Sequence, residues 1–261
     1  MGADQAAPIG GSAVTDTPTP VDLTLVIACY NEEPILEASV AETLQVLDNL
    51  KRTFEIVFVD DASQDGTRGI IDEIIRTHPN HRLRKIEHAG NIGRGGTVTD
   101  GIRAAAAPVV GFIDIDLEVR AGYILPCLLA IDRGYDVATA LRIYKFSVRS
   151  LNRYVMSRGY RWLMRKVLRV PLNDTETGFK FFRRDAVLPI LDRTEDRGWF
   201  WDTEIMVRAH HAGLTIIEIP ALFIRRFDKQ SSLHPFADTL DYARKLWRFR
   251  QTARALGSQI R

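Results

Sequence analysis

Short apolar runs alternate with helical patterns along the first 141 residues. The apolar runs have the length and flanking residues of buried strands, and they cover residues 23–28, 54–59, 83–87, 109–113 and 137–141. Helical spacing of apolar residues predicts helices at 67–76, 97–107 and 124–133, and one more that begins at Pro34. This alternation predicts an α/β fold with a doubly wound, mostly parallel sheet.

The rhythm changes after Leu141. A basic, aromatic segment is followed by a predicted helix, a strand and a last helix, at residues 150–168, 204–211, 215–219 and 236–256. We expect a disordered tail at 1–22, one domain at 23–233 with halves 23–141 and 142–233, and an amphipathic helix at 234–261. The second half is interpreted as a substrate-side extension of the same domain.

The amino-acid composition limits which partners and which cellular compartment we expect. The net charge of +2 over 261 residues gives no signal for nucleic acid. Cys29 and Cys127 lie in apolar segments, which predicts buried free thiols in a reducing compartment. The sequence shows no secretory signal and no run of about 18 apolar residues. We therefore expect a cytoplasmic protein whose contact with a membrane is at most peripheral, at the cytoplasmic face.

Polar residues follow three of the predicted strands directly, at 29–33, 60–67 and 114–118. In an open α/β sheet, ligands bind beyond the carboxyl ends of the strands. Asp114 and Asp116 share one side of an extended segment, and Glu118 joins them if the segment stays extended. Carboxylates in this position suit Mg²⁺ or Mn²⁺, which usually bridge to phosphates. The alternative is a solvated acidic loop.

A glycine-rich loop at residues 90–96 opens a predicted helix. It would place backbone N–H groups and the side chain of Arg94 near an anion. The chain has neither a Walker-type phosphate loop nor a dinucleotide fingerprint after its first strand, which disfavours an NTPase or a dinucleotide enzyme. For Asp65 and Thr67, capping of a helix is an equal alternative to ligand contact.

Several strings together resemble glycosyltransferase family 2: Tyr30-Asn31-Glu32, DDASQDGT from Asp60, NIGRGG from Asn91 and DIDLE from Asp114. NDTETGFKFF from Asn173 and WFWDTE from Trp199 look like the branch of dolichyl- and polyprenyl-phosphate mannose and glucose synthases. The resemblance covers about residues 23–233. It implies the glycosyltransferase A-type, Rossmann-like fold and a nucleotide-sugar donor.

The resemblance also implies roles for individual residues. The nucleotide-sugar site is expected to contain Ala28, Tyr30, Glu32, Val59, Asp61, Arg94, Asp114, Ile115, Asp116 and Arg226. The acceptor phosphate is expected at Arg142, Arg153, Lys180 and Lys229, the metal at Asp114, Asp116 and Glu118, and catalysis at Asp116, Arg142 and Asp202.

Three positions depart from the family pattern. Ala28 replaces a common proline, and Glu118 replaces a common glutamine, which adds a negative charge that favours a metal. Residues 230–232 lie where many relatives have a basic motif, so Lys229 is expected to supply the missing ammonium group.

The preferred reaction is a metal-dependent, inverting transfer of a hexose to a polyprenyl or dolichyl phosphate. The metal and arginines would stabilise the departing diphosphate, and an anionic phosphate acceptor needs no base. The main alternative is a hydroxyl acceptor, which needs Asp202 or Glu204 as a base unless both carboxylates only pin their loop. A nucleotidyltransferase and a binding protein without catalysis are further alternatives.

The basic residues between 149 and 169 and the helix at 236–256 are expected to contact a membrane surface. Arg158, Arg161 and Arg165 share a helical face, which predicts salt-sensitive binding to anionic liposomes. The alternative is that these helices pack on the core and leave a basic face in water.

Overall fold

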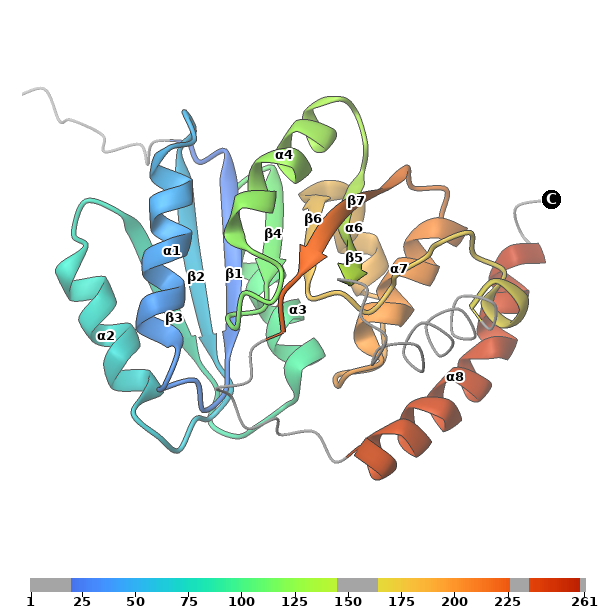
Figure 1. The fold of residues 1–261 in the computed structure, drawn as a ribbon. Coiled ribbons are helices and arrows are strands. Elements are labelled where there is room, and N and C mark those ends of the chain that lie inside the picture. Colours follow the sequence, from blue (N-terminus) through green and yellow to red (C-terminus); the bar gives the residue numbers. More distant parts are fainter. Residues whose placement is uncertain (1–19, 145–163, 226–234, 259–261) are drawn as a thin grey trace, which may run out of the picture.

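The computed structural model describes residues 20–144, 164–225 and 235–258 (Figure 1). Within them, one sheet of seven strands has the order β3-β2-β1-β4-β6-β5-β7. The strands are β1 (Leu23–Cys29), β2 (Phe54–Asp60), β3 (Arg82–Glu87), β4 (Val109–Ile113), β5 (Val137–Tyr144), β6 (Phe179–Arg183) and β7 (Ile216–Phe223). The predicted α/β fold with a mostly parallel sheet is therefore confirmed.

Strand β6 gives the sheet its mixed character. Strands β1 to β4 pair in parallel, as do β5 and β7. Strand β6 lies between β4 and β5 and runs antiparallel to both. It comes from the second half of the chain, so the two expected halves form one continuous sheet rather than two separate units.

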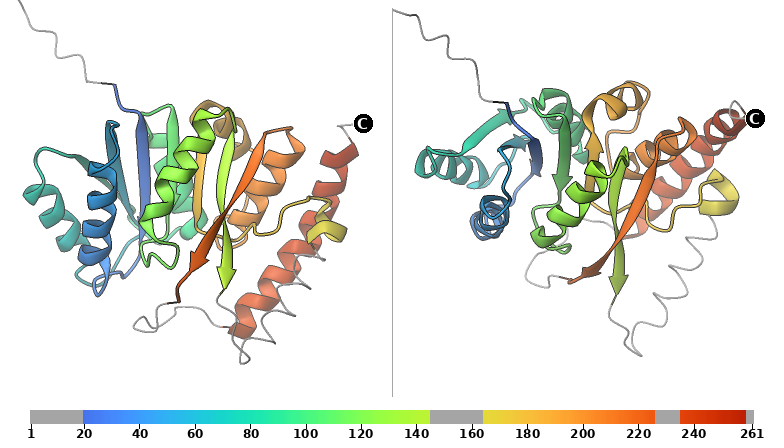
Figure 2. Two further views of the ribbon diagram at one scale, coloured as in Figure 1. Left: turned by 45° about the horizontal axis from the view of Figure 1, so that its top comes forward. Right: turned by 90° about the horizontal axis from the view of Figure 1, so that it is seen from above.

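Helices cover both faces of this sheet (Figure 2). They are α1 (Leu36–Asp48), α2 (Thr67–Thr77), α3 (Arg94–Ala104), α4 (Ile124–Asp132), α6 (Arg184–Leu191), α7 (Trp201–His211) and α8 (Pro235–Ser258), with the short turns η1 (Ala121–Tyr123) and η3 (Met164–Leu168). One apolar core contains α1, α2 and α4, and a second contains α3, α6, α7 and α8. The strands β1, β2 and β4 are thus buried on both sides, which explains their nearly continuous apolar sequences.

Some boundaries differ from the predicted ones. Helix α3 begins at Arg94, three residues earlier than expected, because Gly93 adopts a positive φ of 90° and starts the helix there. Val21 is buried and Asp22 accepts hydrogen bonds from Thr53, so both belong to the fold rather than to a tail. Helix α6 was not predicted from the sequence.

Other predictions concern residues that the structure does not describe, among them Arg153, Arg158, Arg161, Arg226 and Lys229. The prediction of buried thiols is confirmed: Cys29 and Cys127 are both buried and form no disulfide with each other, and burial raises the pKa of Cys127 to about 12. None of the helices in the described residues has the length and apolar character needed to cross a membrane.

Candidate functional site

The loops that follow β1 and β2 are tied to each other by hydrogen bonds at the carboxyl edge of the sheet. Gly66 N donates to Glu33 Oε2 over 2.7 Å, and Glu33 N donates to Asp65 Oδ2 over 3.1 Å. Asn31, which has a positive φ of 55°, donates its amide to Ser63 Oγ over 3.0 Å. Backbone N–H groups therefore stabilise part of the acidic cluster at this edge, and Arg68 Nε adds a contact of 2.6 Å to Asp60 Oδ2.

Asp61 fixes the glycine-rich loop. Its Oδ1 accepts from Ile92 N over 2.8 Å and contacts His88 Nδ1 at 2.9 Å, and its Oδ2 accepts from Gly93 N over 2.9 Å. The side chain is buried, with 3% of its surface exposed. Asp61 was expected to contact a nucleoside, but its carboxylate is committed to holding the start of α3.

The segment after β4 forms a turn and does not stay extended as predicted. Leu117 has a φ of 50° and donates its amide to Asp114 O over 3.1 Å, and Glu118 N donates to Asp116 Oδ1 over 3.2 Å. The three acidic side chains remain partly exposed while Ile115 and Leu117 enter the core. In the described residues, no three acidic, histidine or cysteine side chains converge to hold a metal. The turn changes the backbone register before Glu118, and metal binding by Asp114, Asp116 and Glu118 stays a prediction.

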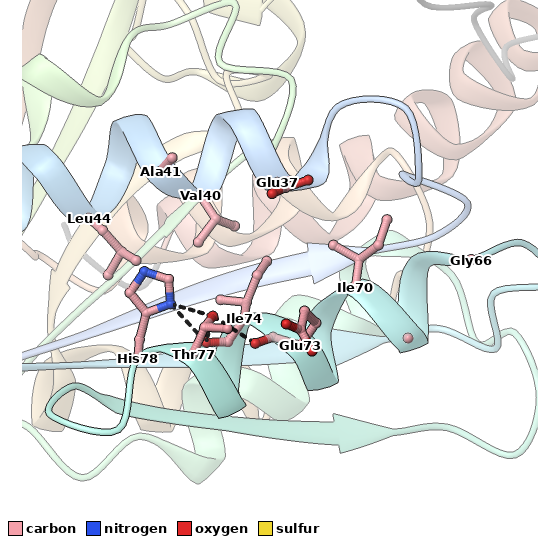
Figure 3. A pocket seen from close by; sticks show the side chains of 11 residues that line it. Glu37, Val40, Ala41, Leu44, Gly66, Ile70, Glu73, Ile74, Thr77 and His78 are labelled. Carbon is pink, nitrogen blue, oxygen red and sulfur yellow. Dashed lines mark hydrogen bonds between the residues drawn. The ribbon is translucent and has the colours of Figure 1, made fainter.

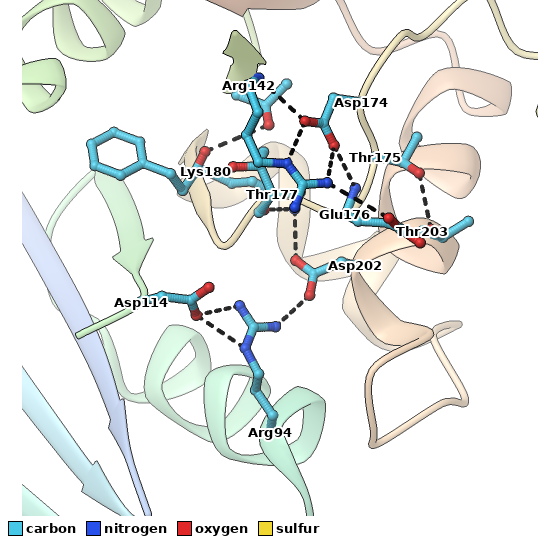
Figure 4. A network of polar contacts seen from close by, with 12 residues as sticks. Arg94, Asp114, Arg142, Asp174, Thr175, Glu176, Thr177, Lys180, Asp202 and Thr203 are labelled. Atoms are coloured by element: carbon cyan, nitrogen blue, oxygen red, sulfur yellow. Dashed lines mark hydrogen bonds and ion pairs between the residues drawn. The ribbon is translucent and has the colours of Figure 1, made fainter. Parts of the chain in front are cut away.

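Arg94 lies at the centre of a network of charged side chains (Figure 4). Its Nε and Nη2 donate to Asp114 Oδ1 over 3.0 and 2.6 Å, and its Nη1 donates to Asp202 Oδ2. The guanidinium lies 5.5 Å from the ring centroids of both Phe112 and Trp199. Burial alone would lower the pKa of Arg94, but the two carboxylates outweigh burial and raise it. Arg94 is thus a charged partner of carboxylates, and its expected contact with a diphosphate is not supported.

Lys180 and Asp202 form a fully buried ion pair. Lys180 Nζ lies 2.6 Å from Asp202 Oδ1 and also donates to the carbonyl oxygen of Thr177. Lys180 has no exposed surface, and Asp202 has 2%. Burial lowers the pKa of Lys180 and Asp202 opposes this effect. The structure gives no support to the predicted contact of Lys180 with an acceptor phosphate, because the ammonium group is enclosed and paired with Asp202.

Arg142, near the end of β5, is held by a carboxylate. Its Nε and Nη2 donate to the two oxygens of Asp174 over 2.7 and 2.8 Å, and Glu176 lies 3.6 Å from Nη2. Burial would lower the pKa of Arg142, but Asp174 outweighs this effect and raises it, so the guanidinium stays charged. About a fifth of the side chain, 21%, remains exposed, so Arg142 can still reach a ligand.

The loop that provides Asp174 is itself anchored to the acceptor half. Asn173 N and Asp174 N donate to Glu218 Oε1 over 2.8 and 2.7 Å, and Thr175 bonds to Thr203 of α7 over 2.9 Å. In the NDTETG string, Asn173 and Thr175 therefore anchor the loop, and Asp174 orients Arg142 at the site.

Glu204, the second candidate base, has a structural role. It accepts the amides of Glu195 and Asp196 over 3.1 and 2.8 Å and pairs with Arg208 Nε at 2.7 Å. The carboxylate is almost completely buried, so it pins the loop before α7, which is the alternative left open for it by the sequence.

The remaining predicted nucleotide-site residues fall into two groups. Tyr30 is 41% exposed, and Ala28 and Glu32 are partly exposed beside it, so these three line the open edge of the sheet. Val59 is completely buried and Ile115 is 2% exposed. Their apolar side chains pack into the core, so they can reach a nucleotide only through their backbone.

Sequence reasoning missed two contributors to this site. His88 is not among the predicted site residues, yet it directly follows β3 and contacts Asp61. Asp174 was quoted only as part of a string, and its pairing with Arg142 was not anticipated. The position of His88 after a strand was an available signal, whereas the Arg142–Asp174 pair joins residues 32 positions apart and left no local pattern.

A groove of about 390 Å³ lies elsewhere, between α1 and α2 (Figure 3). Its floor is apolar, with Val40, Leu44 and Ile74, and Glu37 and Glu73 also line it. None of the predicted site residues lines this groove.

Comparisons with known proteins place the chain in a family. It matches Glycosyl transferase family 2 over residues 24–190. Glycosyltransferase AglD of Haloferax volcanii is 33% identical over 205 residues, which are 77% of this chain and 32% of that protein. The chain thus spans about a third of the length of this relative. A Dolichyl-phosphate beta-glucosyltransferase of Dictyostelium discoideum is 24% identical over 255 residues, which are 91% of this chain and 77% of that protein.

Solved structures share the fold. The mannosyltransferase PcManGT from Pyrobaculum calidifontis, in complex with GDP-Man and Mn²⁺, has a TM-score of 0.57 at 17% identity and covers 93% of this chain and 74% of its own. Glucosyl-3-phosphoglycerate synthase from Mycobacterium tuberculosis, with Mn²⁺, UDP and its product, has a TM-score of 0.57 at 16% identity, covering 89% and 78%. These likenesses confirm the expected glycosyltransferase fold.

Proposed function

The chain belongs to glycosyl transferase family 2, and we propose that it transfers a hexose from a nucleotide sugar to the phosphate of a polyprenyl or dolichyl lipid. The donor is of the UDP-glucose or GDP-mannose type, and transfer inverts the anomeric carbon. The proposal is supported by the names of two relatives that align over 90% or more of the chain, both dolichyl-phosphate beta-glucosyltransferases.

The burial and pairing of Asp202 are the observations that favour one class of acceptor over the other. A hydroxyl acceptor requires a base that can take its proton. Asp202, the expected base, is 2% exposed, and its two oxygens are paired with Lys180 and Arg94. A lipid phosphate is already anionic near neutral pH and requires no base. The geometry therefore favours a phosphate acceptor over a hydroxyl acceptor.

Arg142 is the described residue best suited to hold a phosphate. It is charged, partly exposed and fixed in orientation by Asp174. A guanidinium held in this way presents a rigid donor fork, and such forks match phosphate oxygens. Arg153, Arg226 and Lys229 remain proposed phosphate contacts beyond the described residues.

The residues after β4 fit a divalent metal that is shared with the donor. Mg²⁺ and Mn²⁺ are often bound through one or two carboxylates, with substrate phosphates and waters as the other ligands. Asp116 and Glu118 are partly exposed carboxylates on the outer side of the turn, and Asp114 lies beside them. These residues would hold the ion, and the bound ion would neutralise charge on the departing diphosphate.

The acceptor class is tested by a pair of lipids that differ only in the phosphate. The chain is incubated with Mn²⁺ and labelled UDP-glucose or GDP-mannose, and with either polyprenyl phosphate or the matching polyprenol. We expect a labelled lipid only with polyprenyl phosphate and with one of the two donors. Transfer to polyprenol or to a soluble glycan would reject the phosphate-acceptor proposal.

The metal assignment is tested by Asp116→Asn. We expect transfer to be lost and Mn²⁺-dependent donor binding to be strongly weakened, because the amide cannot neutralise the ion, while the far-ultraviolet circular dichroism is unchanged. Asp192→Asn is the matched control, since Asp192 is exposed and pairs only with Arg103 at the surface. Near wild-type transfer by Asp116→Asn would show that the assignment is wrong.

Helix α8 offers a described surface for peripheral membrane contact. Tyr242, Leu246, Phe249 and Ala253 face the core, which leaves Trp247 64% exposed. Arg244, Arg248 and Arg254 are exposed on the same helix. Each basic residue near an anionic bilayer contributes about 1 kcal/mol at low salt. We expect the protein to co-sediment with phosphatidylserine liposomes. The double variant Arg244→Glu with Arg248→Glu should bind them more weakly, whereas the control Arg193→Glu should bind like wild type. Unchanged binding by the double variant would reject this surface.

A further inference from the structure

Four charged side chains form a continuous chain of ion pairs, Asp114–Arg94–Asp202–Lys180 (Figure 4). They come from four different elements: the turn after β4, the first residue of α3, the first turn of α7, and β6. Asp114 and Arg94 belong to the nucleotide half, and Asp202 and Lys180 to the acceptor half. This charged chain therefore joins the two halves beneath the site.

Burial decreases from one end of the charged chain to the other. Lys180 has no exposed surface, and the side chains of Asp202 and Arg94 are 3% and 14% exposed. The side chain of Asp114 is 43% exposed. The closed end is thus fixed in the core, whereas the open end lies at the turn proposed to hold the metal and the diphosphate.

Gly178 supplies an independent indication that the Asp114–Arg94 contact is built into the fold. Asp114 N donates to Gly178 O over 2.8 Å, so the two backbones touch. A Cβ atom at position 178 would lie 1.8 Å from Asp114 Oδ2 and 2.4 Å from Arg94 Nη2. Any side chain there would push the pair apart, and only glycine allows this close approach.

We infer that Arg94 is a positioning residue for the metal–diphosphate site, and that the Lys180–Asp202 pair is its buried anchor. Arg94 holds Asp114 and, through it, the turn that carries Asp116. Partners that orient metal-binding carboxylates in this way commonly change metal affinity by about 10–100-fold when removed. The inference rests on the proposed function only in assuming that this turn binds a metal with a nucleoside diphosphate.

Calorimetric binding of UDP and GDP to the full chain tests the inference without any acceptor. We compare Arg94→Gln, Asp202→Asn and the double variant with wild type, each with Mn²⁺ and with EDTA. Each single variant should weaken the Mn²⁺-dependent affinity about 10–100-fold. The affinity measured with EDTA should stay unchanged. The double variant should bind no more weakly than the single variant with the lower affinity, because both residues act through the same series of ion pairs.

Other outcomes assign different roles. Wild-type affinity of Asp202→Asn beside a weakened Arg94→Gln would make Arg94 a direct diphosphate ligand and overturn the inference. In a separate transfer assay with polyprenyl phosphate, a loss of kcat of about 10²–10⁴-fold by Asp202→Asn, beside unchanged nucleotide affinity, would make Asp202 a base and overturn its role as an anchor. Equal losses with Mn²⁺ and with EDTA would indicate only a loosened fold. Absence of Mn²⁺-dependent binding by wild type would reject the proposed function together with the inference.

Gly178→Ala tests the same contact without removing a charge. We expect it to weaken Mn²⁺-dependent nucleotide binding as Arg94→Gln does. Gly69→Ala is the matched control, because a Cβ at position 69 meets no atom within 4 Å. Retained affinity in a folded Gly178→Ala protein would contradict the role of the Asp114–Arg94 contact.

Discussion

The two halves of the domain stabilise some of their acidic side chains in different ways. In the nucleotide half, Asp61 and Asp65 accept hydrogen bonds mainly from backbone amides of neighbouring loops, whereas Asp60 and Asp114 pair with Arg68 and Arg94. In the acceptor half, Asp174, Asp202 and Glu204 each pair with a cationic side chain. Backbone amides cannot be replaced by a change of side chain, whereas an ion pair can be broken from either partner.

This difference also changes how the charges at the site are interpreted. From the sequence, the carboxylates after β4 were expected to bind a metal. In the structure, loop amides donate hydrogen bonds to Asp61 and Asp65, and Arg94 pairs with Asp114. A divalent metal is proposed for the chemistry of the diphosphate.

The largest expected loss of stability comes from breaking an ion pair in the acceptor half. Lys180→Met leaves the buried carboxylate of Asp202 with one cation fewer, and breaking a buried pair from one side costs about 3–5 kcal/mol. Urea unfolding followed by fluorescence measures the loss. Lys85→Met is the control, since Lys85 pairs with Asp72 and Glu87 at the surface, where such pairs contribute about 1 kcal/mol or less. Equal losses in both variants would show that burial does not distinguish the pairs.

A smaller effect is expected in the nucleotide half. Asp61→Asn keeps the shape of the side chain but replaces a charged acceptor of two amides, which should cost about 1.5–3 kcal/mol. The loop before α3 should loosen, and amide hydrogen exchange at Ile92 and Gly93 should become faster. Unchanged exchange at these two amides would contradict the assignment of Asp61 as the residue that fixes this loop.

The smallest effect is a pH dependence at Asp65. Burial would raise the pKa of Asp65. Hydrogen bonds from the Thr67 hydroxyl and from the backbone amides of Thr67 and Glu33 outweigh burial and lower this pKa below its ordinary value of 3.8. Because the folded pKa is the lower one, Asp65 stabilises the fold above pH 3.8 and loses this contribution as the pH falls through the folded value. The difference in melting temperature between wild type and Asp65→Asn should therefore shrink on acidification. A difference in melting temperature that is constant with pH would contradict the stabilising role of the ionised Asp65 carboxylate.

The sequence alone determined the fold class, most element positions and the edge of the sheet where the site lies. These features follow from local pattern: apolar runs of strand length, helical spacing, and polar residues directly after each strand. The predicted strand at 109–113 coincides with β4. The family strings further indicated the family, and the family match over residues 24–190 confirms it.

Tertiary structure decided how the site residues are used. Asp114, Asp116 and Glu118 alternate with buried Ile115 and Leu117 as expected. Leu117 nevertheless turns the backbone, and no residue type at that position announces such a turn. Lys180 became a buried anchor because β6 enters the sheet antiparallel between β4 and β5, a placement set by long-range pairing. Arg94 and Asp202 lie 108 positions apart, and only the packing of α3 against α7 brings their charges together. A sequence pattern reports which groups are present at a sheet edge; the partner that each buried charge takes depends on distances that arise only when the whole chain has folded.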